Sequence, residues 1–290
     1  MTVEQKKEPA RVVIGVLAGL VVIVFVVLIL RHNQAGAAHG NGLFSWHDAA
    51  LEEPDRTALF DRMEQLGLTE LYQHVSQVAD PRIVQDFFAS ARERGIRAYL
   101  LSGSPDWALD ETGQALLDAV ERASSLEGCA GLMADVEPHL TPDWDQDQEA
   151  VIQRYLSAMK AAKRASRRAG LELVVCVPYY YDDKAGGTLL DHLVSEGCDA
   201  LAVMNYYRKN EAGHIQTEVQ LCQAYGKRLI HIYELQAPGT QGLETINTYH
   251  DAGLGALYTS WSSLQTRFTG VSMHYALHDY DALRELMDDE

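Results

Sequence analysis

Basic residues are scarce in this sequence, and their scarcity disfavours several kinds of partner. The 290 residues include 24 Lys and Arg against 41 Asp and Glu, which gives a formal net charge of −17. A chain this acidic is a poor partner for nucleic acid or for an anionic membrane surface, because both are negatively charged. A neutral ligand such as a sugar fits this charge better, although acidity more often serves solubility alone.

Cysteines are also few, and they lack the C-x-x-C spacing typical of metal sites. An exported location would permit a disulfide, but Cys176 lies within an apolar run and Cys198 begins another. We therefore predict free thiols, and assign no disulfide, to all four cysteines: Cys129, Cys176, Cys198 and Cys222.

Other catalytic signatures are missing as well. The sequence has no G-x-S-x-G nucleophile elbow, and its histidines show no H-E-x-x-H or similar ligand spacing. A divalent metal would have to be assembled from scattered strand ends, so we assign no metal ion and no cofactor.

One long apolar run is present near the N-terminus. Residues 12–30, "VVIGVLAGLVVIVFVVLIL", carry no charge and meet the length of about 20 residues that crosses a bilayer as a helix. Lys6, Lys7 and Arg11 precede this run and Arg31 follows it, so the basic bias favours a cytoplasmic N-terminus.

This run divides the chain into a cytoplasmic segment 1–11, a transmembrane anchor 12–30, a linker 31–41 and an exported domain 42–290. The exported domain would lie in the periplasm or at the cell surface. A cleaved signal peptide is the alternative, with Ala35-Gly36-Ala37 as its cleavage site. The apolar run exceeds the usual signal core of about 7–15 residues, and Arg31 interrupts it, so we favour an uncleaved anchor.

Beyond the linker, short apolar runs alternate with amphipathic stretches such as 55–67, 81–95 and 149–170. Each of these three stretches ends at a glycine of the kind that caps helices. Strand–helix alternation predicts a parallel sheet, and eight runs over about 250 residues favour the closed (β/α)8 barrel of the α/β class. An open doubly wound sheet is the alternative, but no glycine-rich phosphate turn follows the first strand. The predicted strands are 42–47, 68–76, 96–103, 131–138, 171–180, 198–207, 228–235 and 254–261.

Polar and aromatic side chains cluster where these strands end, which is where such barrels build their active sites. Tryptophan and tyrosine have flat apolar faces with polar edges, which suit sugar rings. Alternatively, these aromatic residues simply pack the rim of the barrel. The candidate site residues are Trp46, Gln73, Trp107, Asp135, Glu137, Tyr179, Asn205, Tyr206, Arg208, Glu234 and Trp261.

Asp135 and Glu137 end the fourth predicted strand. Side chains two apart on a strand share a face, with Cα atoms roughly 6.6 Å apart. One ionised carboxylate would raise the pKa of the other and let it act as a general acid, and Glu137 is the outer of the two. The alternative use of this pair is a salt bridge to Arg208 or to an arginine of a neighbouring helix.

Two segments resemble a known family. "GLMADVEP" resembles the end of the strand-four signature of glycoside hydrolase family 18, the chitinase-like barrels, and "AVMNYY" resembles its M-x-Y segment. Trp261 is placed similarly to that family's sugar-stacking tryptophan. The resemblance implies that Glu137 is the acid, that Asp135 orients the substrate's acetamido group and that Tyr206 hydrogen-bonds its oxygen.

The chain departs from this pattern at Met133 and Ala130, where two further acids are expected, and at Tyr207, where an Asp is expected. Glu137 with Glu234 is also similar to the acid and nucleophile of the large retaining clan of barrel glycosidases, whose carboxyl groups stand about 5–5.5 Å apart. Val136 replaces the Asn that precedes the acid in that clan. Glu234 and a substrate acetamido group are therefore both candidate nucleophiles.

These observations predict a membrane-anchored glycoside hydrolase that acts on a cell-surface or extracellular polysaccharide. The alternative is a catalytically silent barrel that binds glycan or scaffolds a membrane complex. The missing signature acids favour this alternative, and the anchor suits both.

Overall fold

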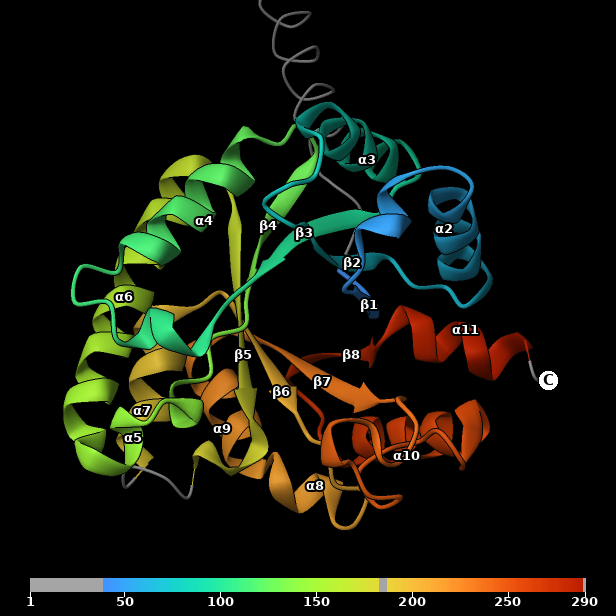
Figure 1. Ribbon diagram of the computed structural model, residues 1–290. Coiled ribbons are helices and arrows are strands. Elements are labelled where there is room, and N and C mark those ends of the chain that lie inside the picture. The colour runs from blue at the N-terminus through green and yellow to red at the C-terminus, as the bar shows by residue number, and fades with distance from the viewer. Residues whose placement is uncertain (1–38, 183–186, 289–290) are drawn as a thin grey trace, which may run out of the picture. The chain divides into compact units, whose positions relative to one another are not determined.

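The alternating runs of the sequence fold into a closed barrel of eight parallel strands, each paired with the next in chain order and β8 with β1 (Figure 1). The computed structural model describes residues 39–182 and 187–288. Its strands are β1 (Gly42–Ser45), β2 (Glu70–His74), β3 (Arg97–Ser102), β4 (Cys129–Ala134), β5 (Glu172–Pro178), β6 (Ala200–Met204), β7 (Arg228–Glu234) and β8 (Ser272–His278). The predicted single (β/α)8 barrel is confirmed.

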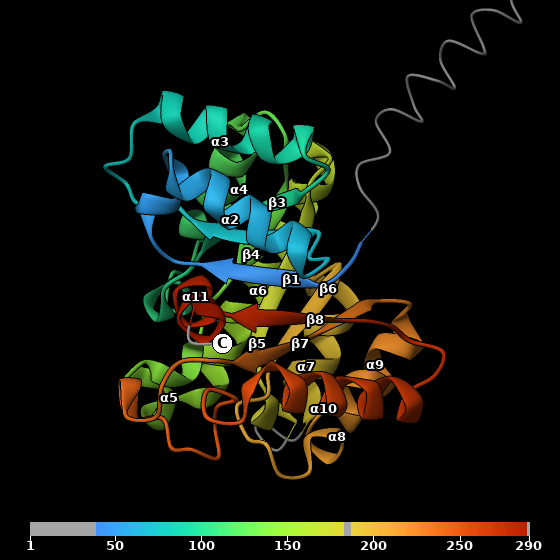
Figure 2. The same cartoon turned by 90° about the vertical axis from the view of Figure 1, so that its right-hand side faces the viewer.

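Helices surround the barrel, and local signals fix their ends (Figure 2). The Asp80 side chain accepts a hydrogen bond from the Arg82 N–H at the start of α3, where Pro81 occupies the first turn. Gly170, in the left-handed region at φ 74°, ends α6. The helices are α2 (Asp55–Gln65), α3 (Pro81–Glu93), α4 (Gln114–Ser125), α5 (Asp143–Gln146), α6 (Gln148–Ala169), α7 (Thr188–His192), α8 (Glu211–His214), α9 (Gln216–Tyr225), α10 (Gly253–Arg267) and α11 (Tyr280–Asp288).

The prediction of a strand at 254–261 is wrong, because this segment lies in α10. Its buried residues Leu254, Leu257, Trp261 and Leu264 recur at spacings of three and four, which is the period of a helix. The eighth strand lies farther along the chain, at Ser272–His278.

The barrel has two apolar layers because successive side chains of a strand point to opposite faces. On β4, Leu132 packs in the layer between the strands and the helices, whereas Met133 packs inside the barrel with Phe44 and Tyr99. The interior also holds Val174 and other small or branched side chains, so it is a packed core rather than a pore.

The predicted cytoplasmic segment 1–11, anchor 12–30 and most of the linker 31–41 lie outside the described residues. Within 39–182 and 187–288, every helix is too short or too polar to span a bilayer. All four cysteines are free thiols, and only Cys129 is partly exposed.

Candidate active site

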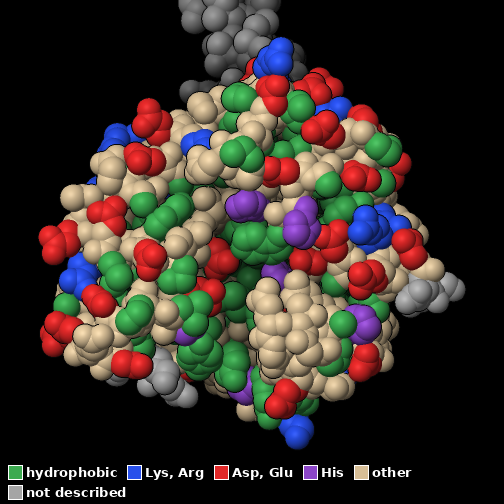
Figure 3. All heavy atoms as spheres, viewed as in Figure 1, with side chains coloured by type: hydrophobic (Ala, Val, Ile, Leu, Met, Phe, Trp, Pro, Cys, Tyr) green, Lys and Arg blue, Asp and Glu red, His purple; other side chains and the backbone are tan. Residues whose placement is uncertain are grey.

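A cavity of about 600 Å³ lies at the carboxyl ends of the strands. Figure 3 shows this face hollowed near its centre, with acidic and histidine side chains around the hollow. Residues from the ends of β1, β4, β6, β7 and β8 meet there, as expected for this barrel. The polar and aromatic side chains that line the cavity include Trp46, Asp135, Glu137, Tyr206, Glu234, Gln241 and His278.

Asp135 and Glu137 both face this cavity. The ladder of β4 continues one residue past the strand, where the Asp135 N–H donates to the Ser102 carbonyl at 3.1 Å. Val136 points into the apolar layer and is 1% exposed, so the two acids on either side of it turn the other way. The Asp135 Oδ1 is buried and has no hydrogen-bond partner within the described residues.

The environment favours the neutral forms of both acids. Burial raises the pKa of Glu137 to about 7, and repulsion from Asp135 adds to this effect while His278 opposes it. Burial also raises the pKa of Asp135. Loss of water around the Glu137 carboxyl is the larger cause, and the charge repulsion expected from the sequence is the smaller one.

The salt-bridge alternative does not hold for Arg208. Its guanidinium donates to the carbonyls of Thr245 and Thr248 at 3.3 and 3.1 Å and lies over the Tyr249 ring. In the described part of the chain, no lysine or arginine nitrogen lies within 4.0 Å of either acid. The nearest basic atom to Glu137 is the His139 Nε2, 3.6 Å from Oε2.

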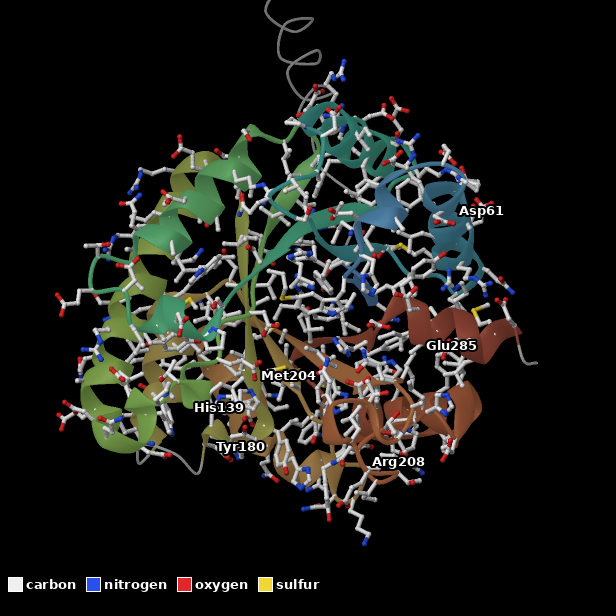
Figure 4. All side chains as sticks on the ribbon, in the orientation of Figure 1. Asp61, His139, Tyr180, Met204, Arg208 and Glu285 are labelled. Atoms are coloured by element: carbon white, nitrogen blue, oxygen red, sulfur yellow. The ribbon has the colours of Figure 1, made fainter. Side chains whose placement is uncertain are left out.

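His139 was missed in the sequence, although it follows Glu137 by only two positions. Its Nδ1 lies 3.0 Å from the Tyr181 hydroxyl and its Nε2 lies 2.8 Å from the Tyr180 hydroxyl (Figure 4). Trp144 stacks on Tyr181 with 12° between the ring planes. This aromatic packing fixes the loop after β4 next to the candidate acid.

Glu234 lines the same cavity but is only 3% exposed. Its Oε1 accepts the Gln236 N–H at 2.8 Å, and its Oε2 lies 2.9 Å from the His278 Nδ1. The Trp46 Nε1 donates to the His278 Nε2 at 2.9 Å. Because the indole nitrogen can only donate, Nε2 accepts this bond and the Nδ1 proton is directed at Glu234. Burial lowers the pKa of His278, but the hydrogen bond from Nδ1 to Glu234 and the charge of that carboxylate outweigh burial and raise it.

The chain of hydrogen bonds through His278 was also missed, because the last strand was expected at 254–261. Trp261 was placed at the end of that strand, but it lies on α10, is 7% exposed and packs on Tyr275 at 5.3 Å between ring centroids. His278 ends the actual β8 and lines the cavity. An apolar–polar alternation in "SMHYALH" was the available signal.

The remaining predicted residues separate into two groups. Tyr206 and Trp46 line the cavity. Gln73 instead lies buried, donating to the carbonyls of His47 and His74.

Asn205 and Tyr179 do not line the cavity but contact residues of α8. Asn205 donates to the Glu211 carbonyl at 3.0 Å, and its Oδ1 lies 3.0 Å from the His214 Nδ1. Tyr179 stacks on His214 with centroids 4.5 Å apart. Trp107 packs against the apolar layer outside the barrel. Within the described ranges, no three His, Cys, Asp or Glu side chains are placed to hold a metal ion.

Comparison with known proteins finds relatives by structure only: no family model and no curated protein matches the sequence. A chitinase from Chromobacterium violaceum aligns over 87% of this chain and 98% of its own, at 14% identity and a TM-score of 0.55. A GH18 chitinase from Pseudoalteromonas aurantia aligns over 87% and 100%, at 9% identity and a TM-score of 0.57. The PgaB (BpsB) glycoside hydrolase domain from Bordetella bronchiseptica aligns over 87% and 97%, at 10% identity and a TM-score of 0.54. Such low identities concern the fold, and the chain therefore has the fold of the chitinase-like glycoside hydrolase barrels.

Proposed function

We propose that this chain is a glycoside hydrolase that acts on a cell-surface or extracellular polysaccharide, with Glu137 as its general acid. The observation that carries the proposal is the state of this carboxyl group. It faces an open cavity, has no lysine or arginine beside it within the described residues, and has a pKa raised to about 7. About half of such groups hold a proton at neutral pH, as donation to a leaving glycosidic oxygen requires.

Asp135 supports this role as an acceptor. Its Oδ1 is buried without a partner among the described residues, so a substrate N–H or O–H that reached it would satisfy it. By resemblance to family 18, that donor would be the acetamido N–H of the sugar. Tyr206 and Trp46 would supply aromatic surface to the same ring.

We favour the substrate's acetamido group over Glu234 as the nucleophile. Both Glu234 oxygens accept hydrogen bonds, and the side chain is 3% exposed. The acetamido oxygen would attack the anomeric carbon while Glu137 gives its proton to the leaving oxygen. Glu137, then ionised, would take a proton from the water that opens the cyclic intermediate.

The location of the barrel is part of the proposal. We infer that residues 12–30 form an uncleaved transmembrane anchor, with the N-terminus in the cytoplasm and the barrel in the periplasm or outside the cell. The charge-free apolar run and its flanking basic residues support this inference. We expect a protease to digest the barrel when it is added to cells whose outer surface is permeabilised. The same protease acting from the cytoplasm should leave the barrel intact.

A silent glycan-binding or scaffolding barrel is the second candidate. Met133, at a position where family 18 has an acid, is fully buried beside the Cys176 sulfur at 3.3 Å. The barrel interior is therefore apolar at Met133, where the family is acidic.

The test compares the full-length chain in detergent with its Glu137→Gln variant on bacterial polysaccharides, including N-acetylated ones, by counting new reducing ends. Loss of a general acid should slow release by about 10²–10⁴-fold. Glu121→Gln, at an exposed position on α4, is the matched control and should behave as wild type. If all three proteins bind a glycan and none of them releases reducing ends, the enzyme is rejected and the silent barrel remains.

A further inference from the structure

The loop between β7 and α10 holds one glutamine in an unusual backbone conformation at the cavity. Gln241 lines the cavity and has φ 49°. Only Asn210 and Gln241, among the described residues other than glycine, have positive φ. Left-handed backbone is unfavourable for a side chain such as glutamine, because its Cβ crowds the backbone.

The turn around Gln241 does not itself require a glutamine. Gly239 and Gly242, on either side, adopt φ 95° and 82°. The Gly239 N–H donates to the Leu243 carbonyl at 2.7 Å, and the Leu243 N–H donates to the Thr240 carbonyl at 2.9 Å. These bonds are all made by the backbone, so a third glycine at 241 would form the same turn without steric cost.

Asn210 has a local explanation that Gln241 lacks. Asparagine tolerates the left-handed region, and the Asn210 carbonyl accepts the N–H groups of Gly213 and His214 at the start of α8. The Gln241 side chain is exposed and makes no hydrogen bond to any residue in 39–182 or 187–288. Strained backbone that serves no local contact is typical of binding sites.

Hydrogen bonds at the base of the loop that carries Gln241 fix the loop beside the cavity. The Asn247 amide donates to the Tyr206 carbonyl at 2.7 Å, and the Arg208 N–H donates to the Ile246 carbonyl at 2.9 Å. The loop is thus tied to the end of β6, whose Tyr206 lines the same cavity.

We propose that Gln241 is a substrate-contacting residue that hydrogen-bonds a sugar unit at the mouth of the cavity. An amide offers two N–H donors and one carbonyl acceptor, which match the hydroxyl and acetamido groups of a neutral glycan. Because Gln241 is exposed at the rim, it contacts a unit beyond the bond that is cleaved. This inference rests on the proposed function and names a residue that determines how the glycan binds.

The test is Gln241→Gly in the full-length chain, with the tetramer of N-acetylglucosamine as the probe. Loss of one hydrogen bond should raise KM about threefold to tenfold and leave kcat within about twofold, because the contact lies away from the reacting atoms. Tm should stay within about 2 °C, since relief of the left-handed backbone offsets the larger freedom of unfolded glycine. Asn210→Gly is the matched control and should leave KM unchanged.

Calorimetric binding of the tetramer to Glu137→Gln, with and without Gln241→Gly, separates this inference from the proposed function. A weaker Kd with Gln241→Gly supports the contact even if the wild type hydrolyses nothing. Unchanged KM and Kd, or a fall in kcat together with Tm, would overturn it. A wild type that neither binds nor cleaves the tetramer overturns both the contact and the acetamido chemistry.

Discussion

Carboxylates that are buried or partly buried occur at both ends of this barrel, but their surroundings differ. At the amino ends of the strands, Arg228 lies 2.8 Å from Glu70 and 3.0 Å from Glu172, and the Tyr72 hydroxyl donates to Glu70 at 2.7 Å. Burial raises the pKa of Glu70, but the hydrogen bond from His39 and the charge of Arg228 outweigh it and bring the pKa to about 2.

At the carboxyl ends, Asp135 and Glu137 have no such cation within the described residues, and the pKa of Glu137 is about 7. The pKa of a glutamate is thus lowered at one end of the barrel and raised at the other. A buried acid matched by arginine is satisfied by the protein alone. A partly buried acid that faces a cavity and has no arginine or lysine beside it lacks a partner that a ligand can supply, which is typical of a functional site.

The largest expected effect concerns the amino ends of the strands, where the carboxylates are paired with arginine. Arg228→Met removes the more buried of the two arginines that pair with Glu70 and Glu172, while Arg97 stays 3.1 Å from Glu172 and 3.8 Å from Glu70. A buried ion pair that loses one member costs about 3–5 kcal/mol of unfolding free energy, which urea titration at pH 7 measures.

Arg82→Met is the control for this change. Arg82 pairs with Asp80 at 3.0 Å, but its side chain is 91% exposed, and water screens the pair. The urea midpoint should not move. Equal effects of the two substitutions would show that the network at the amino ends carries no special stability.

A smaller effect is expected at the carboxyl ends of the strands, where Glu137 should make the stability of the chain depend on pH. Because the pKa of Glu137 is raised from 4.5 to about 7, the folded chain holds a proton between these values that the unfolded chain has lost. Wild-type stability therefore falls as pH rises from 4.5 to 7. Glu137→Gln escapes this loss and should be more stable than wild type by about 1–3 kcal/mol at pH 8, a range that allows for solvent at its open side.

Urea titrations at pH 4.5, 6 and 8 measure this difference, which should grow with pH. Glu70→Gln should behave in the opposite sense. Its lowered pKa stabilises the fold above pH 4.5, and that stabilisation is lost as pH falls toward 2. A constant difference between Glu137→Gln and wild type would show that this carboxyl is ordinarily solvated and would remove the contrast between the ends.

Most of the barrel was predictable because a parallel strand is short, apolar and followed by a helix with a glycine cap. Seven of the eight predicted strands overlap β1 to β7. The run 254–261 was mistaken for the eighth, since its eight residues carry no charge, and a short apolar run of this kind fits a helix and a strand alike. Tertiary packing decides between them, because Leu257 and Trp261 are buried on one face of α10.

The residues of the candidate site were predictable only where a reactive side chain comes directly after a strand that was itself predicted correctly. Asp135 and Glu137 satisfy this condition, and Tyr206 follows β6 in the same way. His278 was lost with the misplaced strand. Gln241 lies on a loop, and nothing in its sequence reveals a left-handed backbone for a glutamine.

The smallest expected effect concerns how the cavity end is held together without ion pairs to arginine. Trp46→Phe removes the N–H that the His278 Nε2 accepts at 2.9 Å, a neutral bond that contributes about 0.5–1.5 kcal/mol to stability. The freed Nε2 can then take a proton while Glu234 still faces Nδ1 at 2.9 Å, so the pKa of His278 should rise above its wild-type value. Histidine NMR signals followed against pH measure this shift, with the exposed His192, whose Nδ1 lies 2.8 Å from the Thr188 carbonyl, as the internal reference. A pKa of His278 that stays constant would mean that the hydrogen bond from Trp46 does not oppose protonation of the imidazole.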